Sequence, residues 1–300
     1  MRTLIVAGLL GLVSISAVHA QMTDDQRRAE VDKLNWQRGG IQKLTSSHST
    51  LSVPGDHAVL VGADAVRFEQ IIGNHNIGDI EAVTVDQADE QVIFQSIQEG
   101  HVSLDDWNDI DAKAMLDSIS ENTDKDNAER TRDGIPPMHI IGWVQQPTLD
   151  RTTNTVYWAI AATQGNENIV NSRALRLGRS GFELLTWVGN GNAYQAVGGD
   201  LDVMLRSFSF DQGSRYSDFT TGDKVAAYSI GGLVATIAGA KLLKVAAAGG
   251  LLLFFKKIAI FIFAAVAALL AKIKGLFRRK KVVPVAPTDP PMAGPPAGSG

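Results

Sequence analysis

Two long apolar runs, one near each end of the chain, enclose a central region whose apolar residues come in short groups separated by turn residues. Short groups of this kind are typical of strands and amphipathic helices, whereas long apolar runs are typical of targeting and membrane segments. The pattern predicts four parts: a signal peptide over residues 1–20, an exported domain over 21–222, membrane segments with a basic end over 223–281, and a disordered Pro/Gly-rich tail over 282–300.

The N-terminal run has the features of a secretory signal peptide. Arg2 supplies a positive charge ahead of the apolar stretch, and Val18, His19 and Ala20 form a small-residue cleavage pattern. The apolar stretch itself, residues 4–18, is too short for an ideal membrane span. We therefore expect the mature chain to begin at Gln21, with an uncleaved N-terminal anchor as the alternative.

The C-terminal apolar region contains two candidate spans, residues 225–240 and 258–271, followed by the basic group Arg278-Arg279-Lys280-Lys281. Basic ends favour the cytoplasmic side of a membrane. A single crossing therefore places the domain in the periplasm and the tail in the cytoplasm, and a two-segment hairpin is the alternative. We expect an inner-membrane protein with its main domain in the periplasm and the lipid bilayer as a partner.

The central region predicts an α+β domain. Residue spacing indicates helices over 24–35, 63–72, 104–120 and 193–208, and strands over 49–53, 58–62, 82–85, 92–99, 139–144, 155–162, 169–177 and 182–188. Pro54-Gly55 is interpreted as a turn and residues 121–137 as an exposed loop. The last four strands, closely spaced between turn residues, predict an antiparallel β-meander packed with helices, followed by one or more C-terminal transmembrane helices. Residues 21–221 are expected to fold alone.

Charge and cysteine content narrow the possible partners. From Val225 onward the chain has ten Lys and Arg against one acidic residue, a charge of +9, so the preceding part carries −13 of the total of −4. An acidic domain argues against nucleic acid as a partner. The chain has no Cys, which excludes disulfides, a lipid anchor on an N-terminal Cys and a cysteine nucleophile.

No motif for a metal, a cofactor or catalysis stands out. The histidines after residue 20 have no ligand spacing, and residues 105–111 lack the glycine and the glutamate of a calcium loop. Residues 178–181 do not match the nucleophile elbow, and the loop beginning at Gly189 places Tyr194 where a dinucleotide-binding loop needs glycine. We predict no metal site and no cofactor, and we expect no enzymatic activity.

Several short segments, taken in chain order, resemble a bacterial family of membrane-anchored proteins known as domain of unknown function 2167. These segments are Trp36 with Gly39-Gly40, Leu51-Ser52-Val53-Pro54, Glu99-Gly100-His101-Val102, Gly142-Trp143, Tyr157-Trp158-Ala159, Leu177-Gly178-Arg179-Ser180-Gly181 and Gly222-Asp223-Lys224. The resemblance implies no activity. The order of elements late in the domain is also similar to the Mog1/PsbP-like sandwich, a likeness that implies no function.

The candidate ligand-binding residues are Arg179, Asn171, Asp150 and Trp158. Arginine suits two-point recognition of a carboxylate or phosphate, so Arg179, with Arg176 nearby, would fit an anionic ligand. The alternative is that Arg179 holds its turn by bonding carbonyl groups. Three tryptophans on neighbouring strands, Trp158 among them, form either a binding platform or part of the core.

The function expected from the sequence is a membrane-anchored, periplasmic, non-catalytic interaction or accessory module of the cell envelope, with envelope proteins as partners. The alternative is a periplasmic ligand-binding protein or hydrolase whose site carries no recognisable motif. A third hypothesis assigns the C-terminal tail a structural role in the bilayer.

Overall fold

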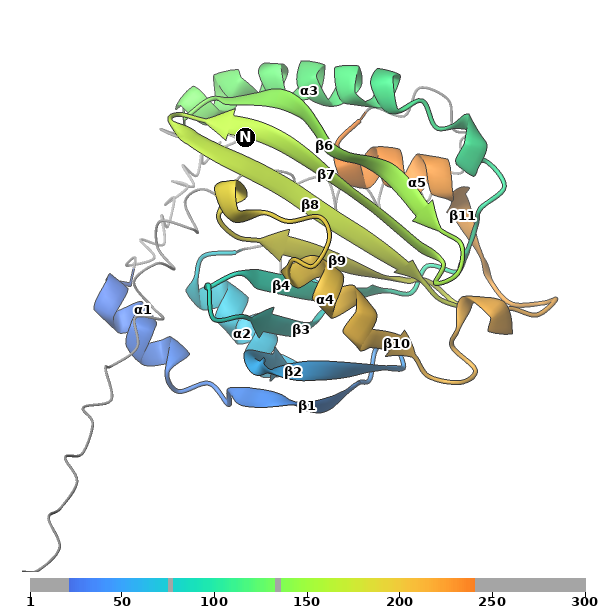
Figure 1. Ribbon diagram of the computed structural model, residues 1–300, viewed down its shortest axis with the longest axis horizontal. Helices are drawn as coiled ribbons and strands as arrows, with labels where there is room; N and C mark the ends of the chain where they lie inside the picture. Colours follow the sequence, from blue (N-terminus) through green and yellow to red (C-terminus); the bar gives the residue numbers. More distant parts are fainter. Residues whose placement is uncertain (1–21, 75–77, 133–135, 241–300) are drawn as a thin grey trace, which may run out of the picture.

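The computed structural model describes residues 22–74, 78–132 and 136–240. A large antiparallel sheet dominates this part of the chain, with helices on both of its faces (Figure 1). The strands are β1 Gln37–Leu44, β2 Ser49–Val61, β3 Ile80–Val85, β4 Gln91–Ile97, β5 His101–Ser103, β6 Met138–Asp150, β7 Thr155–Gln164, β8 Glu167–Leu177, β9 Phe182–Val188, β10 Phe208–Phe210 and β11 Val225–Ser229. The α-helices are α1 Asp24–Val31, α2 Ala63–Ile71, α3 Ala112–Arg132, α4 Asp200–Ser207 and α5 Ile230–Ala238, and the 3₁₀ turns are η1 Trp107–Asp109, η2 Gly191–Ala193 and η3 Tyr216–Asp218.

The sheet confirms the predicted meander. Its strand order is β1-β2-β3-β4-β9-β8-β7-β6, with β10 paired to β2, so the last four long strands follow one another as hairpins. A separate parallel pair joins β11 to β5. The α+β class is therefore confirmed for the described residues.

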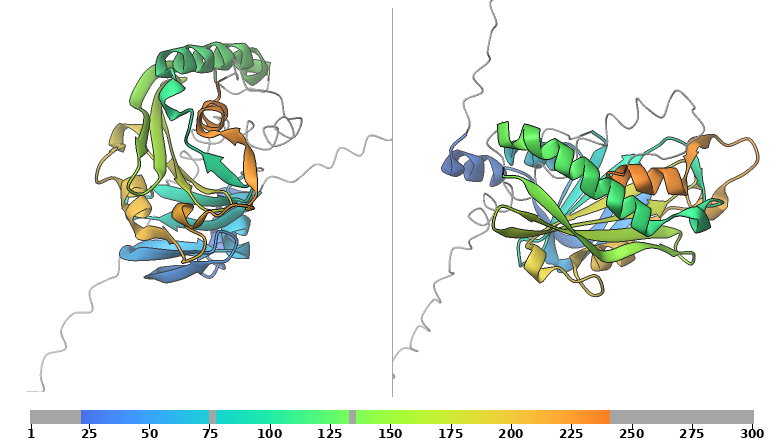
Figure 2. Two further views of the ribbon diagram at one scale, coloured as in Figure 1. Left: turned by 90° about the vertical axis from the view of Figure 1, so that its right-hand side faces the viewer. Right: turned by 90° about the horizontal axis from the view of Figure 1, so that it is seen from above.

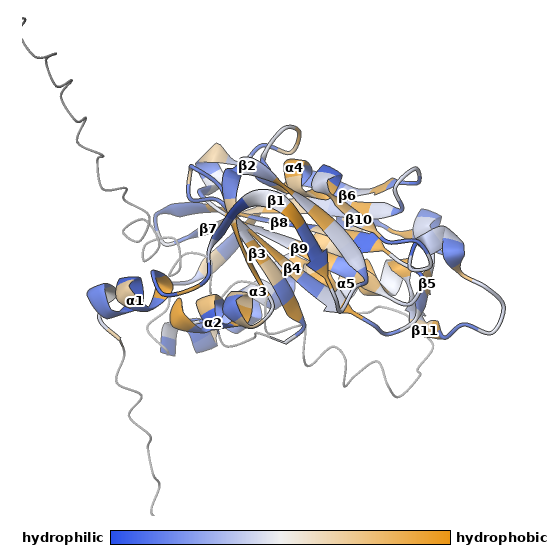
Figure 3. Ribbon diagram, turned by 90° about the horizontal axis from the view of Figure 1, so that it is seen from below, coloured by the Kyte–Doolittle hydropathy of each residue, from blue (hydrophilic) through white to orange (hydrophobic). Residues whose placement is uncertain are grey.

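The two faces of the sheet are covered differently. On one face, α3 and α5 pack over the buried cluster around Trp158 and Leu175, while α2 covers a neighbouring cluster on the β3–β4 side. On the other face, α4 and β10 pack over a third cluster, which contains Phe94, Ala174 and Trp187 (Figures 1 and 2). Hydrophobic colouring follows the central strands β3, β4 and β9, and α1 is mainly hydrophilic (Figure 3).

The predicted turn at Pro54-Gly55 is wrong, because β2 runs through both residues. The pairing of β2 with β1 shifts register here, between Arg38 and Gly40. Because the hydrogen-bond ladder is interrupted at this point, the strand can contain Pro54, which has no N–H to donate. β1 is also an edge strand, where an interrupted ladder of hydrogen bonds costs least.

The predicted bounds of the helix after β5 are also wrong. α3 begins at Ala112 and continues to Arg132, across most of the stretch interpreted as a loop. Met115, Ile119 and Thr123, four residues apart, are its buried residues, while the other residues of the helix are partly or fully exposed. Asn127 anchors the second half by exchanging two hydrogen bonds of 2.8 Å with the backbone of Met138.

The folded unit extends beyond residue 222, where the sequence placed its end. β11 pairs with β5, and α5 places Ile230, Leu233, Val234 and Ile237 in the core at 1% exposure or less. The first candidate membrane segment, residues 225–240, is therefore packed against the domain in this structure. An apolar helix flanked by a sheet and a second helix needs no lipid to bury its surface.

Polar side chains from distant parts of the chain hold both ends of α5. Asp106 accepts hydrogen bonds at the N-terminus from the Ser229 hydroxyl and from the Gly231 N–H, the latter at 3.2 Å. At the C-terminus, Arg173 donates to the carbonyl of Ile237 at 3.1 Å, and Asn122 donates to that of Gly239 at 2.9 Å. A negative charge at the start and a positive charge at the end also suit the helix dipole.

No helix within the described residues is both long and apolar enough to cross a membrane. The expected signal peptide, the second candidate span, the basic group and the tail lie outside those residues.

Candidate functional site

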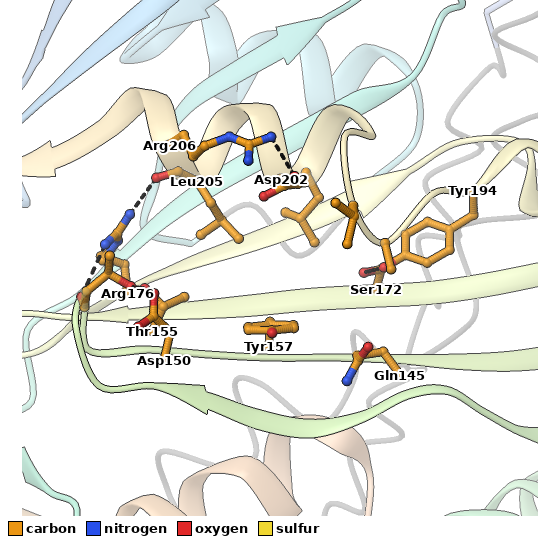
Figure 4. A pocket seen from close by; sticks show the side chains of 14 residues that line it. Gln145, Asp150, Thr155, Tyr157, Ser172, Arg176, Tyr194, Asp202, Leu205 and Arg206 are labelled. Atoms are coloured by element: carbon orange, nitrogen blue, oxygen red, sulfur yellow. Dashed lines mark hydrogen bonds and ion pairs between the residues drawn. The ribbon is translucent and has the colours of Figure 1, made fainter.

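A cleft of about 290 Å³ lies between α4 and strands β6, β7 and β8, with the loop of residues 194–199 forming part of its wall. We call it the α4 cleft. Its position follows from the sheet, because residues two apart on a strand share one face. Tyr157 of β7 and Ser172 and Arg176 of β8 all point to the α4 side (Figure 4).

The helical wall of the cleft is made by an amphipathic helix. Leu201 and Met204 of α4 are buried against the sheet. Asp202 and Arg206, one turn apart, lie on the cleft side and form an ion pair of 2.6 Å. Leu201 and Leu205 contribute apolar surface to the same wall. The helix begins after Gly198-Gly199, later than the predicted start at residue 193, and this leaves the 194–199 segment free to border the cleft.

Tyr157 forms the middle of the cleft, between an Arg176–Asp150 end and a Ser172–Tyr194 end (Figure 4). Its neighbour on β8 is Ala174, a small residue that leaves room above the sheet. At the second end, the hydroxyls of Ser172 and Tyr194 are 2.7 Å apart. Burial raises the pKa of Tyr194, so its hydroxyl stays neutral at physiological pH.

The charges at the first end are held by local hydrogen bonds. Asp150 accepts from the N–H of Thr152 at 2.8 Å and the hydroxyl of Thr153 at 2.7 Å. The Thr153 hydroxyl is the main reason that the pKa of Asp150 lies below its usual value. Arg176 donates to the carbonyls of Thr153 at 3.1 Å and Leu205 at 2.5 Å, so it bridges the β6–β7 turn to the end of α4.

The charged side chains of the α4 cleft are two carboxylates, Asp150 and Asp202, and two guanidinium groups, Arg176 and Arg206. They sum to no net charge. The lining contains no His, and the hydroxyl of Ser172 meets a tyrosine and not a general base.

The structure brings only one of the four predicted site residues, Asp150, into the cleft. Asn171 is buried on β8 next to Ser172, so its side chain faces the opposite side of the sheet. Trp158 is 1% exposed in the core beneath α3 and α5. Arg179 lies in the β8–β9 turn, where it bonds Asp223 and the carbonyl of Gly213. These bonds agree with the alternative interpretation, in which Arg179 holds its turn in place.

The three tryptophans do not form a platform. Trp143 and Trp158 pack into the cluster on the α3 and α5 side, whereas Trp187 packs into the cluster on the α4 side. Trp143 donates to the carbonyl of Ala112 at 3.0 Å, and Trp187 donates to Glu90 at 3.0 Å. Each of these two indoles therefore joins the sheet to a neighbouring segment.

A second group of ionisable residues surrounds the start of α4. The ring of His57 lies between Asp200, 2.6 Å from Nε2, and Asp56, 2.8 Å from Nδ1. Burial opposes protonation of His57, but the two carboxylates outweigh it and raise the pKa to about 9. Because both ring nitrogens are engaged by carboxylates, His57 ties α4 to β2 and is not available to activate a nucleophile.

A buried acidic pair lies within the same half of the sheet. Glu183 of β9 is fully buried, and Glu81 is 5% exposed. Burial, reinforced by the neighbouring Glu81, raises the pKa of Glu183 well above its ordinary value. No group of three or more His, Asp or Glu in the described ranges is arranged to hold a metal ion.

Sequence reasoning missed Tyr157, Ser172, Tyr194 and Asp202 as cleft residues. Alternation along β7 and β8 could have placed Tyr157 and Ser172 on one face. Nothing in the sequence indicated that α4 would lie over that face or that residues 194–199 would remain irregular.

Comparison with known proteins identifies a family and finds a weak likeness to solved structures. No curated protein matches the chain. Among solved structures, the solution structure of cyanobacterial PsbP (CyanoP) from Synechocystis sp. PCC 6803 is similar with a TM-score of 0.36 and 12% identity, over 59% of this chain and 92% of that one. A likeness at this level does not establish a shared fold. The model of the family described as protein of unknown function (DUF2167) matches residues 36–267, and the chain belongs to this family.

Proposed function

We propose that this protein is a non-catalytic interaction module of the cell envelope, anchored in the inner membrane with its domain in the periplasm, and that the α4 cleft is its binding surface. The observation that carries the proposal is the chemistry of the cleft. Polar groups from three strands, a loop and a helix converge there, while its charges balance and its lining holds no activated nucleophile. Pockets with a few convergent polar groups are the usual sites of ligand recognition.

The membrane anchor and the periplasmic location rest on the sequence. The N-terminal signal pattern, the apolar run after residue 240 and the basic group Arg278-Arg279-Lys280-Lys281 support them. With the domain folded as far as Ala240, 17 residues separate it from the second candidate span, which begins at residue 258. The module would therefore work close to the membrane surface.

Site-specific photocrosslinking in intact cells tests the proposal. A photoreactive residue replaces Val197, which is 82% exposed at the edge of the cleft, and in a separate chain replaces Ile41, which is 71% exposed on the distant strand β1. We expect an adduct of altered electrophoretic mobility from position 197 that is absent from position 41. The same result at both positions, or no adduct at either, would contradict the proposal.

The alternative function, a periplasmic hydrolase, requires a base beside a nucleophile. His57, beside the start of α4, is one candidate base, and both of its ring nitrogens are bonded to carboxylates. The geometry therefore favours binding over hydrolysis.

A further inference from the structure

Three polar atoms in the α4 cleft are open to a ligand. The hydroxyl of Tyr157, Oδ1 of Asp202 and Oε1 of Gln145 make no hydrogen bond within the described part of the chain, while the other oxygen of Asp202 bonds Gly198 and Arg206. The Gln145 amide nitrogen is used locally, by Thr148 at 2.8 Å. Two acceptors and one hydroxyl are therefore presented to whatever enters the cleft.

The apolar part of the cleft lies beside these atoms. The ring of Tyr157 is half-buried in the middle, and Leu201, Leu205 and Val197 contribute apolar surface around it. An occupant must therefore present an apolar face to a tyrosine ring and hydrogen-bonding groups at its edges (Figure 4). The face of an aromatic ring carries negative charge density, so it attracts weakly positive C–H groups.

The charge of the cleft favours a neutral occupant. Its two carboxylates and two guanidinium groups balance, and Asp202 and Arg206 already form an ion pair. Two nitrogens of Arg176 donate hydrogen bonds to backbone carbonyls, so Arg176 offers no open two-point site for an anion. A ligand with a full charge would lose hydration in a cleft whose charges already balance and are mostly bonded, which favours a neutral ligand.

We propose that the α4 cleft binds an uncharged saccharide, with one sugar ring against the side chain of Tyr157 and ring hydroxyls bonded to Gln145 and Asp202. A sugar ring has C–H faces and a rim of hydroxyls, which is the combination the cleft accommodates. The volume of about 290 Å³ lies near the lower limit for ligand pockets and suits a single ring of a longer chain. This inference rests on the proposed function and names the class of ligand for the same site.

The test uses the full chain in lipid nanodiscs prepared without glycoside detergents, because such detergents would compete for the cleft. Maltotetraose, cellotetraose and chitotetraose are titrated and followed by saturation-transfer NMR and calorimetry. Tetragalacturonate and tetra-alanine serve as anionic and peptide probes. We expect saturable binding of at least one neutral tetrasaccharide, with neither of the other probes binding as tightly.

Two matched pairs of variants locate the binding. Ala196→Trp fills the cleft, whereas Gln195→Trp places the same ring on the neighbouring exposed residue outside it. Gln145→Ala removes a proposed ligand contact, whereas Gln146→Ala removes an adjacent exposed amide. We expect the first member of each pair to weaken binding about tenfold or more, equivalent to one good hydrogen bond or a steric block, and the second to bind as wild type.

Several results would overturn the inference: no neutral tetrasaccharide binding, tighter binding of the anionic or peptide probe, or equal effects within each pair of variants. Circular dichroism and melting temperatures confirm that all four variants fold. If the crosslink at position 197 forms but no saccharide binds, the ligand class is wrong and the proposed function stands. If neither the crosslink nor saccharide binding is seen, the proposed function and the ligand class are both wrong.

Discussion

Arg179 holds Asp223 through two nitrogen–oxygen contacts of 2.8 Å, and this pair joins the β8–β9 turn to the chain that enters β11. Asp223 also accepts the N–H of Thr220 at 2.8 Å. Because α5 follows β11 directly, the pair helps to hold the last element of the folded unit.

Replacing Arg179 with Lys should loosen this attachment, because an ammonium group cannot reproduce the two-point geometry of a guanidinium. We expect a lower melting temperature and hydrogen exchange in β11 and α5 that is faster by about tenfold or more. Arg151→Lys, at an exposed position in the β6–β7 turn, is the control. Unchanged hydrogen exchange in β11 and α5 would show that the Arg179–Asp223 pair does not stabilise these elements.

A fragment ending at residue 222 should fail to form a stable domain, whereas one ending at residue 240 should unfold cooperatively. The shorter fragment lacks Tyr228, Ile230, Leu233, Val234 and Ile237, all of which are 6% exposed or less. Burying five such side chains contributes on the order of 10 kcal/mol, comparable with the stability of a whole domain. Dye binding to exposed apolar surface and urea unfolding would distinguish the fragments. Equal stability would mean that α5 is dispensable.

Gly181→Ala should be strongly destabilising, because a Cβ at this position would lie 1.9 Å from the carbonyl oxygen of Ile97. Backbone on both sides must move, and we expect a loss of about 2 kcal/mol or more. Gly55→Ala is the control, because a Cβ there meets nothing within 4 Å, and it should change stability by no more than about 0.5 kcal/mol. Similar losses at both positions would show that space at Gly181 does not limit the fold.

The stabilising effect of His57 should disappear in mild alkali. Its folded pKa of about 9 lies above the ordinary value of 6.5, so its contribution is complete below pH 6.5 and is lost as the pH rises through 9. Since solvent screens part of the interaction, we expect on the order of 1–2 kcal/mol. Urea unfolding of wild type and His57→Gln, using residues 22–240, gives this difference at each pH. A difference independent of pH would show that folding does not raise the pKa of His57.

Membrane topology can be read from single cysteines, because the chain has none of its own. For one crossing, we expect Ser299→Cys to resist a membrane-impermeant maleimide in intact cells and to react after lysis. Ser217→Cys, at an exposed position of η3, should react in intact cells. Equal labelling of both in intact cells would instead support the hairpin.

The order and type of most elements follow from local chemistry, and the sequence alone was sufficient to predict them. Alternation and turn residues placed β7, β8 and β9 within a few residues of their observed bounds, because the hairpins form between neighbours in the chain. The short segments between Trp36 and Lys224, taken in chain order, likewise identified the family, which the family model confirms.

Contacts between distant segments decided what the sequence could not. An apolar stretch such as residues 225–240 reads the same whether a bilayer or a protein core covers it, and only the packing of α5 between α3 and the sheet shows which applies in this structure. The site depended on the same kind of contact. Tyr157 and Asp202 are 45 positions apart, and they border one cleft because α4 crosses the face of the sheet on which Tyr157 lies. Residue spacing along a strand shows which residues share a face of the sheet. It does not show which of the two faces a later helix will cover, because that depends on how all the elements together bury their apolar surface.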